Sequence, residues 1–108
     1  MHPLTFVYEP GRPMAEITLI EWLANAAPGD QIVYWRGRLS NDINVVHQGL
    51  TEIERKRLCR VARRAWHMSD LDQVHLVQRR VDIGVFDYIA IARPEPRRSP
   101  SRWIKEAA

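Results

Sequence analysis

Residues 51–67, TEIERKRLCRVARRAWH, concentrate side chains that bind anions. The segment carries six Lys or Arg residues against two acidic ones, a local charge of +4 in a chain whose net charge is +3. Lys and Arg bind phosphates and carboxylates, and Arg can also donate two hydrogen bonds to one guanine edge. The chemistry that these residues indicate is therefore the binding of an acidic partner.

No residue pattern in the chain predicts catalysis. The sequence has four His and one Cys, so it can form no internal disulfide and no zinc site built on several cysteines. Cys59 falls on the apolar side of residues 51–67, where a small core residue is a simpler interpretation than a nucleophile. His67 and His75 have no further ligands at metal-binding spacing, and the glycines form no phosphate loop. We expect a protein that is not an enzyme and that needs no metal or cofactor.

A helix is the element that would position the cations. Thr51 and Glu54 make the Thr-x-x-Glu pattern of a capping box, and Glu52 and Lys56 form an i,i+4 pair with the acid leading. At about 100° per residue, one side of this helix is apolar and the opposite arc is cationic, interrupted by Ile53. The apolar side comprises Leu58, Cys59, Val61, Ala62, Ala65, Trp66 and Met68. The cationic arc comprises Lys56, Arg57, Arg60, Arg63, Arg64 and His67.

The candidate binding residues belong to the helix, a predicted hairpin and the C-terminal tail. A recognition helix brings its N-terminal part to base edges, and phosphate contacts fix its position. The N-terminal part here comprises Arg55, Lys56, Arg57 and Arg60, and the later turns provide Arg63, Arg64 and His67. Secondary contacts would come from Arg79 and Arg80, which precede the hairpin turn. A flexible basic arm would comprise Arg97, Arg98, Arg102 and Lys105.

The rest of the chain predicts one small α+β domain. Apolar residues at 17, 20, 23 and 24 lie at helical spacing, and the pair Pro28-Gly29 ends that helix. QIVYW predicts a short buried strand, and VHLVQRR and GVFDYIAIA predict two strands joined through residues 81–84. We expect these strands to form a small antiparallel sheet against the helices. Residues 1–14 predict an irregular arm with a short extended piece at LTFVY, residues 15–93 the folded domain, and residues 94–108 a basic, proline-rich tail.

Residues 36–50 leave two conformations open. Ser40 or Asn41 could cap a short helix that runs to His47 and ends at Gly49. The β-branched residues at 43, 45 and 46 oppose that helix, because they lose rotamer freedom in it. A helix packed across residues 51–67 would complete a helix-turn-helix and favour DNA as the partner, whereas a loop would weaken that interpretation.

Three stretches, APGDQIVYWRGRL, VARRA and VHLVQRRVDIGVFDYIAIAR, resemble small uncharacterised proteins of proteobacterial genomes and prophages. The resemblance covers residues 17–93 and implies a winged-helix-like fold and a phage connection. It implies no activity and no catalytic residues. The elements predicted from the sequence follow the order of a winged helix: helix, strand, short helix, long helix and hairpin.

Two kinds of partner fit these features. With DNA, the protein would be a small phage-type transcription regulator, and a homodimer would match paired half-sites. The alternative is a phage-encoded inhibitor that binds an acidic surface of a host protein or defence complex. Asp70, Asp72, Asp82 and Asp87 near the hairpin favour the alternative, because an acid at the hairpin tip repels phosphate. A merely solvated helix face is a third interpretation. The single Cys favours a reducing, cytoplasmic setting. No apolar run approaches the roughly 18 residues of a membrane span.

The four Trp residues carry separate predictions. Trp22 and Trp66 are predicted to be core residues. Of Tyr34 and Trp35, one is expected to be exposed, because side chains alternate along a strand. Trp103 and its neighbour Ile104 would either dock on a partner or a second subunit, or pack back on the domain.

Overall fold

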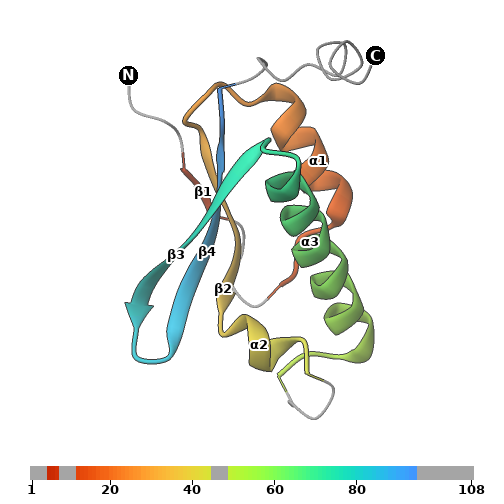
Figure 1. Cartoon of the computed structure of the whole chain (residues 1–108). Coiled ribbons are helices and arrows are strands. Elements are labelled where there is room, and N and C mark those ends of the chain that lie inside the picture. The colour runs from red at the N-terminus through yellow and green to blue at the C-terminus, as the bar shows by residue number, and fades with distance from the viewer. Residues whose placement is uncertain (1–4, 8–11, 45–48, 95–108) are drawn as a thin grey trace.

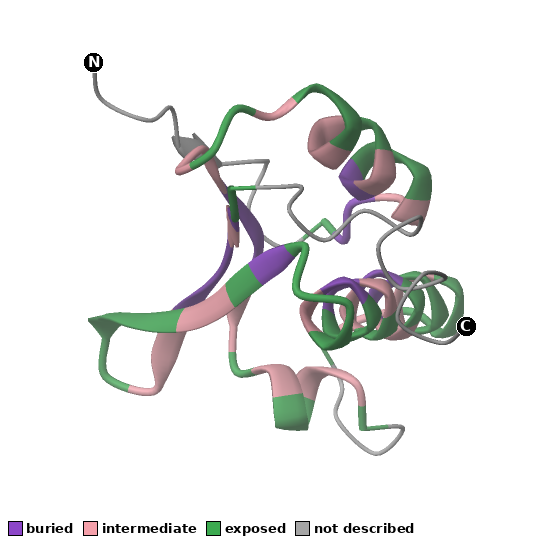
Figure 2. Ribbon diagram, turned by 45° about the horizontal axis from the view of Figure 1, so that its top comes forward, coloured by how far each residue is buried: buried purple, intermediate pink, exposed green. Residues whose placement is uncertain are grey.

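The computed structural model describes residues 5–7, 12–44 and 49–94, with only the backbone of residues 5–7 (Figure 1). The elements in chain order are β1 Thr5–Val7, α1 Glu16–Asn25, β2 Gln31–Gly37, α2 Leu39–Asp42, α3 Glu52–Asp70, β3 Val74–Asp82 and β4 Val85–Ala92. The strands form one sheet in the order β1-β2-β4-β3. Both α1 and α3 lie on the same side of this sheet (Figure 2).

The predicted α+β class is confirmed, and so is the antiparallel sheet of β2, β4 and β3. The sheet has one strand more than predicted, because β1 pairs in parallel with β2 at the edge. This strand lies within the extended piece that the sequence predicts in the N-terminal arm. The described core lies between the sheet and the two long helices, and its fully buried residues include Leu19 of α1, Leu58 of α3 and Val74 of β3.

The start of α3 follows from the capping box that the sequence predicts. The Thr51 hydroxyl accepts a hydrogen bond from the Glu54 backbone N–H at 3.1 Å, and the Glu54 carboxylate accepts one from the Thr51 N–H at 3.0 Å. These bonds satisfy backbone donors that a helix start leaves without partners. The helix ends where Asp72 adopts a positive φ of 61°.

The apolar side of α3 is confirmed at Leu58, Val61, Ala65 and Met68, which are all buried. The prediction that Trp66 is a core residue is wrong, because 67% of its surface is exposed. Trp66 is turned about 100° around the helix from Ala65, which faces the core directly. That rotation carries the large ring to the edge of the apolar side. Trp22 of α1 is partly buried and packs against the core.

The prediction that one of Tyr34 and Trp35 is exposed is also wrong. Both side chains are buried, at 5% and 3% exposure, and both belong to the same core cluster. The pairing of β2 with β4 shifts register between Val33 and Trp35. A bulge places two residues opposite one and interrupts the alternation of side chains. The Trp35 indole N–H then donates to Asp42 Oδ2 at 2.8 Å, which ties β2 to α2.

The segment after β2 forms a single helical turn, α2. This turn begins at Leu39, one residue before the predicted cap at Ser40. The predicted helix would continue to His47, but residues 45–48 lie outside the described residues. The turn is held against the sheet, because the Leu39 N–H donates to the Tyr88 hydroxyl at 2.9 Å. The described residues therefore do not establish a second helix packed across α3.

The predicted hairpin is confirmed, with Ile83 and Gly84 between β3 and β4. Gly84 has a φ of +70°, which glycine adopts at little cost. Asp82 Oδ1 accepts a hydrogen bond from the Ile83 N–H at 2.7 Å. The far end of the hairpin projects away from the helices (Figure 1).

Candidate anion-binding surface

The exposed cations of α3 form the surface best suited to bind an anion. We call Lys56, Arg57, Arg60, Arg63 and His67 the α3 surface, and all five residues are exposed. At 1.5 Å of rise per residue, they extend over about 16 Å of helix. The opposite side of α3 is fixed against the core by Leu58, Val61, Ala65 and Met68. The cations are therefore presented on a rigid element.

Acidic neighbours relieve only part of this charge. Glu52 Oε2 lies 3.4 Å from Lys56 Nζ, which confirms the predicted i,i+4 pair, and 4.0 Å from Arg55 Nη2. Within the described part of the chain, no carboxylate pairs with Arg57, Arg60 or Arg63. Among the residues that the structure describes, nothing prevents these three guanidinium groups from binding an external anion.

Arg64 has a different role from its neighbours. Its Nε donates to Glu16 Oε2 at 2.8 Å, and this ion pair joins α3 to α1. Both side chains are partly shielded from solvent. The structure thus places Arg64 between two helices, although the sequence assigned it to the cationic arc. Arg55 is likewise half-buried rather than fully presented.

Arg79 does not join the α3 surface. Asp87 accepts hydrogen bonds from Arg79 Nη2 at 2.9 Å, from Arg36 Nε at 2.6 Å and from Arg36 Nη2 at 3.0 Å. The next residue, Tyr88, belongs to the core on the helix side, so alternation turns Asp87 and its partners to the opposite face of the sheet. Arg80 is exposed. Because successive side chains of a strand point to opposite faces, Arg80 faces the side of the sheet that carries the helices.

Asp87 is the charged residue whose role the sequence analysis misjudged. It is completely buried, and hydrogen bonds from Arg36, followed by those from Arg79, lower its pKa despite its burial. The carboxylate is thus neutralised within the sheet and does not repel a partner. No sequence pattern indicated this triad, because Arg36 and Asp87 are 51 positions apart. Asp70, Asp72 and Asp82, in contrast, are exposed.

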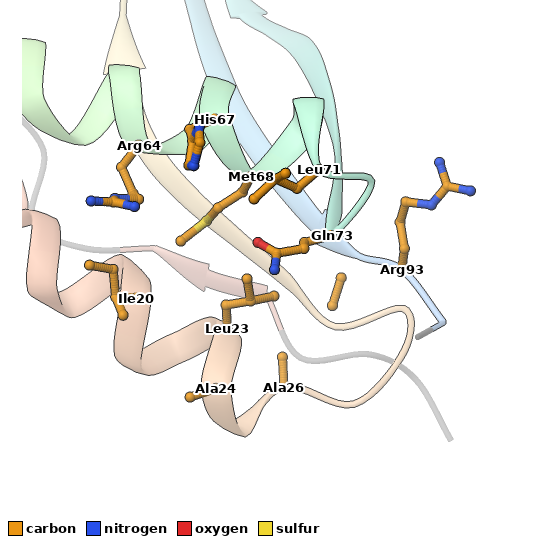
Figure 3. A pocket seen from close by; sticks show the side chains of 11 residues that line it. Ile20, Leu23, Ala24, Ala26, Arg64, His67, Met68, Leu71, Gln73 and Arg93 are labelled. Carbon is orange, nitrogen blue, oxygen red and sulfur yellow. The ribbon is translucent and has the colours of Figure 1, made fainter. Parts of the chain in front are cut away.

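Large grooves lie on both sides of α3. The first, of about 660 Å³, lies between α3, α2 and β3, and we call it the α3–β3 groove. It is lined by Tyr34, Leu39, Ile43, Cys59, Ala62, Arg63, Trp66, His67, Asp70 and Leu76. The second, of about 630 Å³, lies between α1 and α3, with Arg64 and His67 on one side and Leu23 on the other (Figure 3). Trp66 was not predicted to line a groove, although its wheel position at the edge of the apolar side was the available signal.

The structure describes only some of the remaining candidate residues. Arg97, Arg98, Arg102, Trp103 and Lys105 lie outside the described residues. Cys59 is partly buried in the α3–β3 groove. Among residues that the structure describes, no group of three His, Cys, Asp or Glu side chains could hold a metal ion, and no helix has the length and apolar character needed to cross a membrane.

Comparison with protein-family models, curated proteins and solved structures finds no match to this chain. The arrangement defines the protein at the level of its class, an α+β fold that presents a cationic helix. The winged-helix resemblance therefore stays an expectation from sequence.

Proposed function

We propose that the protein binds nucleic acid, with duplex DNA as the expected target, through the α3 surface. The observation that carries the proposal is the set of exposed guanidinium groups of Arg57, Arg60 and Arg63, which have no carboxylate partner in the described part of the chain. Duplex DNA carries one negative charge per about 1.7 Å, and cations that contact it release condensed counterions. A dense anion of this kind relieves the repulsion among the three Arg side chains.

A winged-helix-like mode of binding, in a small transcription regulator of phage type, is the specific form of this proposal. Its support is the order of α1, β2, α2, α3 and the β3–β4 hairpin. In this mode α3 would enter the major groove, and Arg80 on the hairpin would contact a neighbouring phosphate. Arg79 would be excluded from that contact because Asp87 holds it.

An acidic protein surface is the second candidate, and two exposed apolar residues favour it. Ile53 interrupts the cationic arc with 71% of its surface exposed, and Ile83 at the hairpin turn is 83% exposed. Apolar side chains at such positions suit a protein interface better than a phosphate backbone. The exposed Asp82 beside Ile83 points in the same direction.

Fluorescence anisotropy with a labelled mixed-sequence duplex across a salt series tests the proposal. Four contacts, from Lys56, Arg57, Arg60 and Arg63, predict a slope of log K against log salt of about −3.6, at about −0.9 per contact. The variant Arg60→Glu/Arg63→Glu is expected to reduce the slope by at least about 1.8. Arg64 is left unchanged because its substitution would also break the pair with Glu16.

The matched control is Arg12→Glu/Arg38→Glu, which changes the net charge equally at exposed positions outside α3. The proposal requires this control to keep most of the salt dependence. If the wild-type protein fails to bind the duplex at low salt, or if both double variants weaken binding equally, the α3 surface is not a DNA-binding site. An acidic protein then becomes the better candidate.

A further inference from the structure

Trp66 lies in an unusual setting for a tryptophan. It is largely exposed on α3, three residues after Arg63 and next to His67, and the ring lines the α3–β3 groove. An indole exposed beside cations contributes nothing to the core. Exposed aromatic rings beside basic groups are the elements with which proteins stack bases of single-stranded nucleic acids.

The same groove carries a polar group that a ligand can reach. Tyr34 lines the groove and is 5% exposed. Within the described residues its hydroxyl makes no hydrogen bond, and it is not one of the buried polar atoms that lack a partner, so the hydroxyl is open to solvent. Burial, with a smaller contribution from Tyr88, raises the pKa of Tyr34 to about 12, so the hydroxyl keeps its proton. A neutral phenol both donates and accepts hydrogen bonds. A ligand with an aromatic face and polar edges would satisfy Trp66 and Tyr34 together.

The charges around the groove indicate where a phosphate backbone would run. Arg63 and His67 belong to both the groove and the α3 surface, and Arg60 lies about one turn before Arg63. Asp70 stands at the opposite end of the groove, beyond Trp66, and would repel phosphate there. A backbone that follows the cations toward the start of α3 would therefore leave the groove itself to a base.

We propose that Trp66 and the α3–β3 groove hold an unpaired nucleobase of the nucleic acid whose phosphates contact the α3 surface. The inference rests on the proposed nucleic-acid binding and specifies its substrate as DNA in which a base beside the contacted phosphates is unpaired. A base inside a duplex is stacked on its neighbours and offers no free face to Trp66. An apolar partner helix is the rival occupant, but it would leave the Tyr34 hydroxyl without a hydrogen bond.

The test compares three labelled probes by anisotropy. These are a single-stranded dT dodecamer, an abasic dodecamer with the same phosphates, and the dT·dA duplex of equal length. We expect wild-type protein to bind dT more tightly than the abasic strand, which offers the same phosphates without bases, while the duplex reports phosphate binding by the α3 surface alone. Stacking on one aromatic ring is worth about 5- to 150-fold in affinity by alanine substitution. Trp66→Ala should remove that preference, while Trp66→Phe should retain most of it, because phenylalanine keeps an aromatic face.

Tyr34→Phe adds a readout for the groove floor. It keeps the ring but removes the hydroxyl, so dT affinity should fall while abasic affinity stays unchanged. Because Trp66 is exposed, urea unfolding of Trp66→Ala should match that of the wild-type protein and exclude a folding defect.

The outcomes separate this inference from the proposed function. If dT and the abasic strand bind equally, or if Trp66→Ala leaves the dT preference intact, the base site is refuted although phosphate binding by α3 stands. If Arg60→Glu/Arg63→Glu leaves all three affinities unchanged, or if no probe binds, the proposed function and this inference both fall.

Discussion

Asp87→Asn tests whether the buried carboxylate holds the sheet together. Asp87 receives three hydrogen bonds of 2.6, 3.0 and 2.9 Å from Arg36 and Arg79. Asparagine presents a single acceptor oxygen and an NH₂ group that must face guanidinium donors. At least one of the three hydrogen bonds is lost, and the remaining bonds lose the assistance of charge.

The magnitude follows from the number of bonds and the exposure of the two arginines. Hydrogen bonds to charged groups contribute about 1.5–3 kcal/mol each, and neutral ones about 0.5–1.5 kcal/mol. The side chains of Arg36 and Arg79 are 35% and 54% exposed, so water compensates part of the loss. We expect Asp87→Asn to lower the free energy of unfolding by about 2–3 kcal/mol, below the roughly 3–5 kcal/mol for breaking a fully buried pair.

Urea unfolding followed by tryptophan fluorescence measures this loss. The control is Asp70→Asn, which removes an exposed carboxylate at the end of α3 and is expected to change stability by less than about 0.5 kcal/mol. A loss below about 0.5 kcal/mol for Asp87→Asn as well would refute the assignment of the triad as a stabilising element.

The same triad predicts a dependence of stability on pH. The Arg36 hydrogen bond, with those of Arg79, holds the pKa of Asp87 below its usual value. A carboxyl group with a lowered pKa in the folded state adds stability that is present above its unfolded pKa, about 3.9. That stability is lost as the pH falls through the folded pKa. The difference between the wild-type protein and Asp87→Asn should therefore be constant near neutral pH and shrink below about pH 4.

Two further substitutions test local features of the fold by urea unfolding. Thr51→Ala removes one half of the capping box and should cost about 1 kcal/mol, while Thr51→Ser should restore most of it; equal stability of Ala and Ser would contradict the cap. Gly84→Ala should lower the free energy of unfolding by about 1–2 kcal/mol, because alanine resists the positive φ. No neighbouring atom lies within 4 Å of the added Cβ, so a larger loss would show that something other than backbone strain is involved.

The sequence was most informative where local signals agree. The capping box, the apolar side of α3 and the turn at residues 83–84 each depend on residues close in the chain, and each was predicted. The burial of both Tyr34 and Trp35 was not predictable by alternation, because a register shift in β2 breaks the alternation. Strand β1 was indicated only as an extended piece, because its pairing with β2 joins distant segments.

The candidate surface was predicted in part. The sequence identified the exposed Lys56, Arg57, Arg60 and Arg63, since wheel position alone decides their exposure. It did not separate Arg64 and Arg79 from them, because the carboxylates that engage these two residues come from α1 and β4. Long-range partners therefore decide which cations of a basic segment remain free.

Strand β3 lies at the edge of the sheet, where its arginines can keep the protein from aggregating. In the described part of the chain, no strand pairs with the outer side of β3. Unpaired backbone groups on an edge strand invite a strand of another molecule, and charged side chains discourage that approach. Arg79 and Arg80 lie on this edge, one turned to each face of the sheet. We expect Arg79→Thr/Arg80→Thr to self-associate more than the wild-type protein as the concentration rises in light scattering. A molecular mass equal to that of the wild-type protein would show that these charges do not protect the edge.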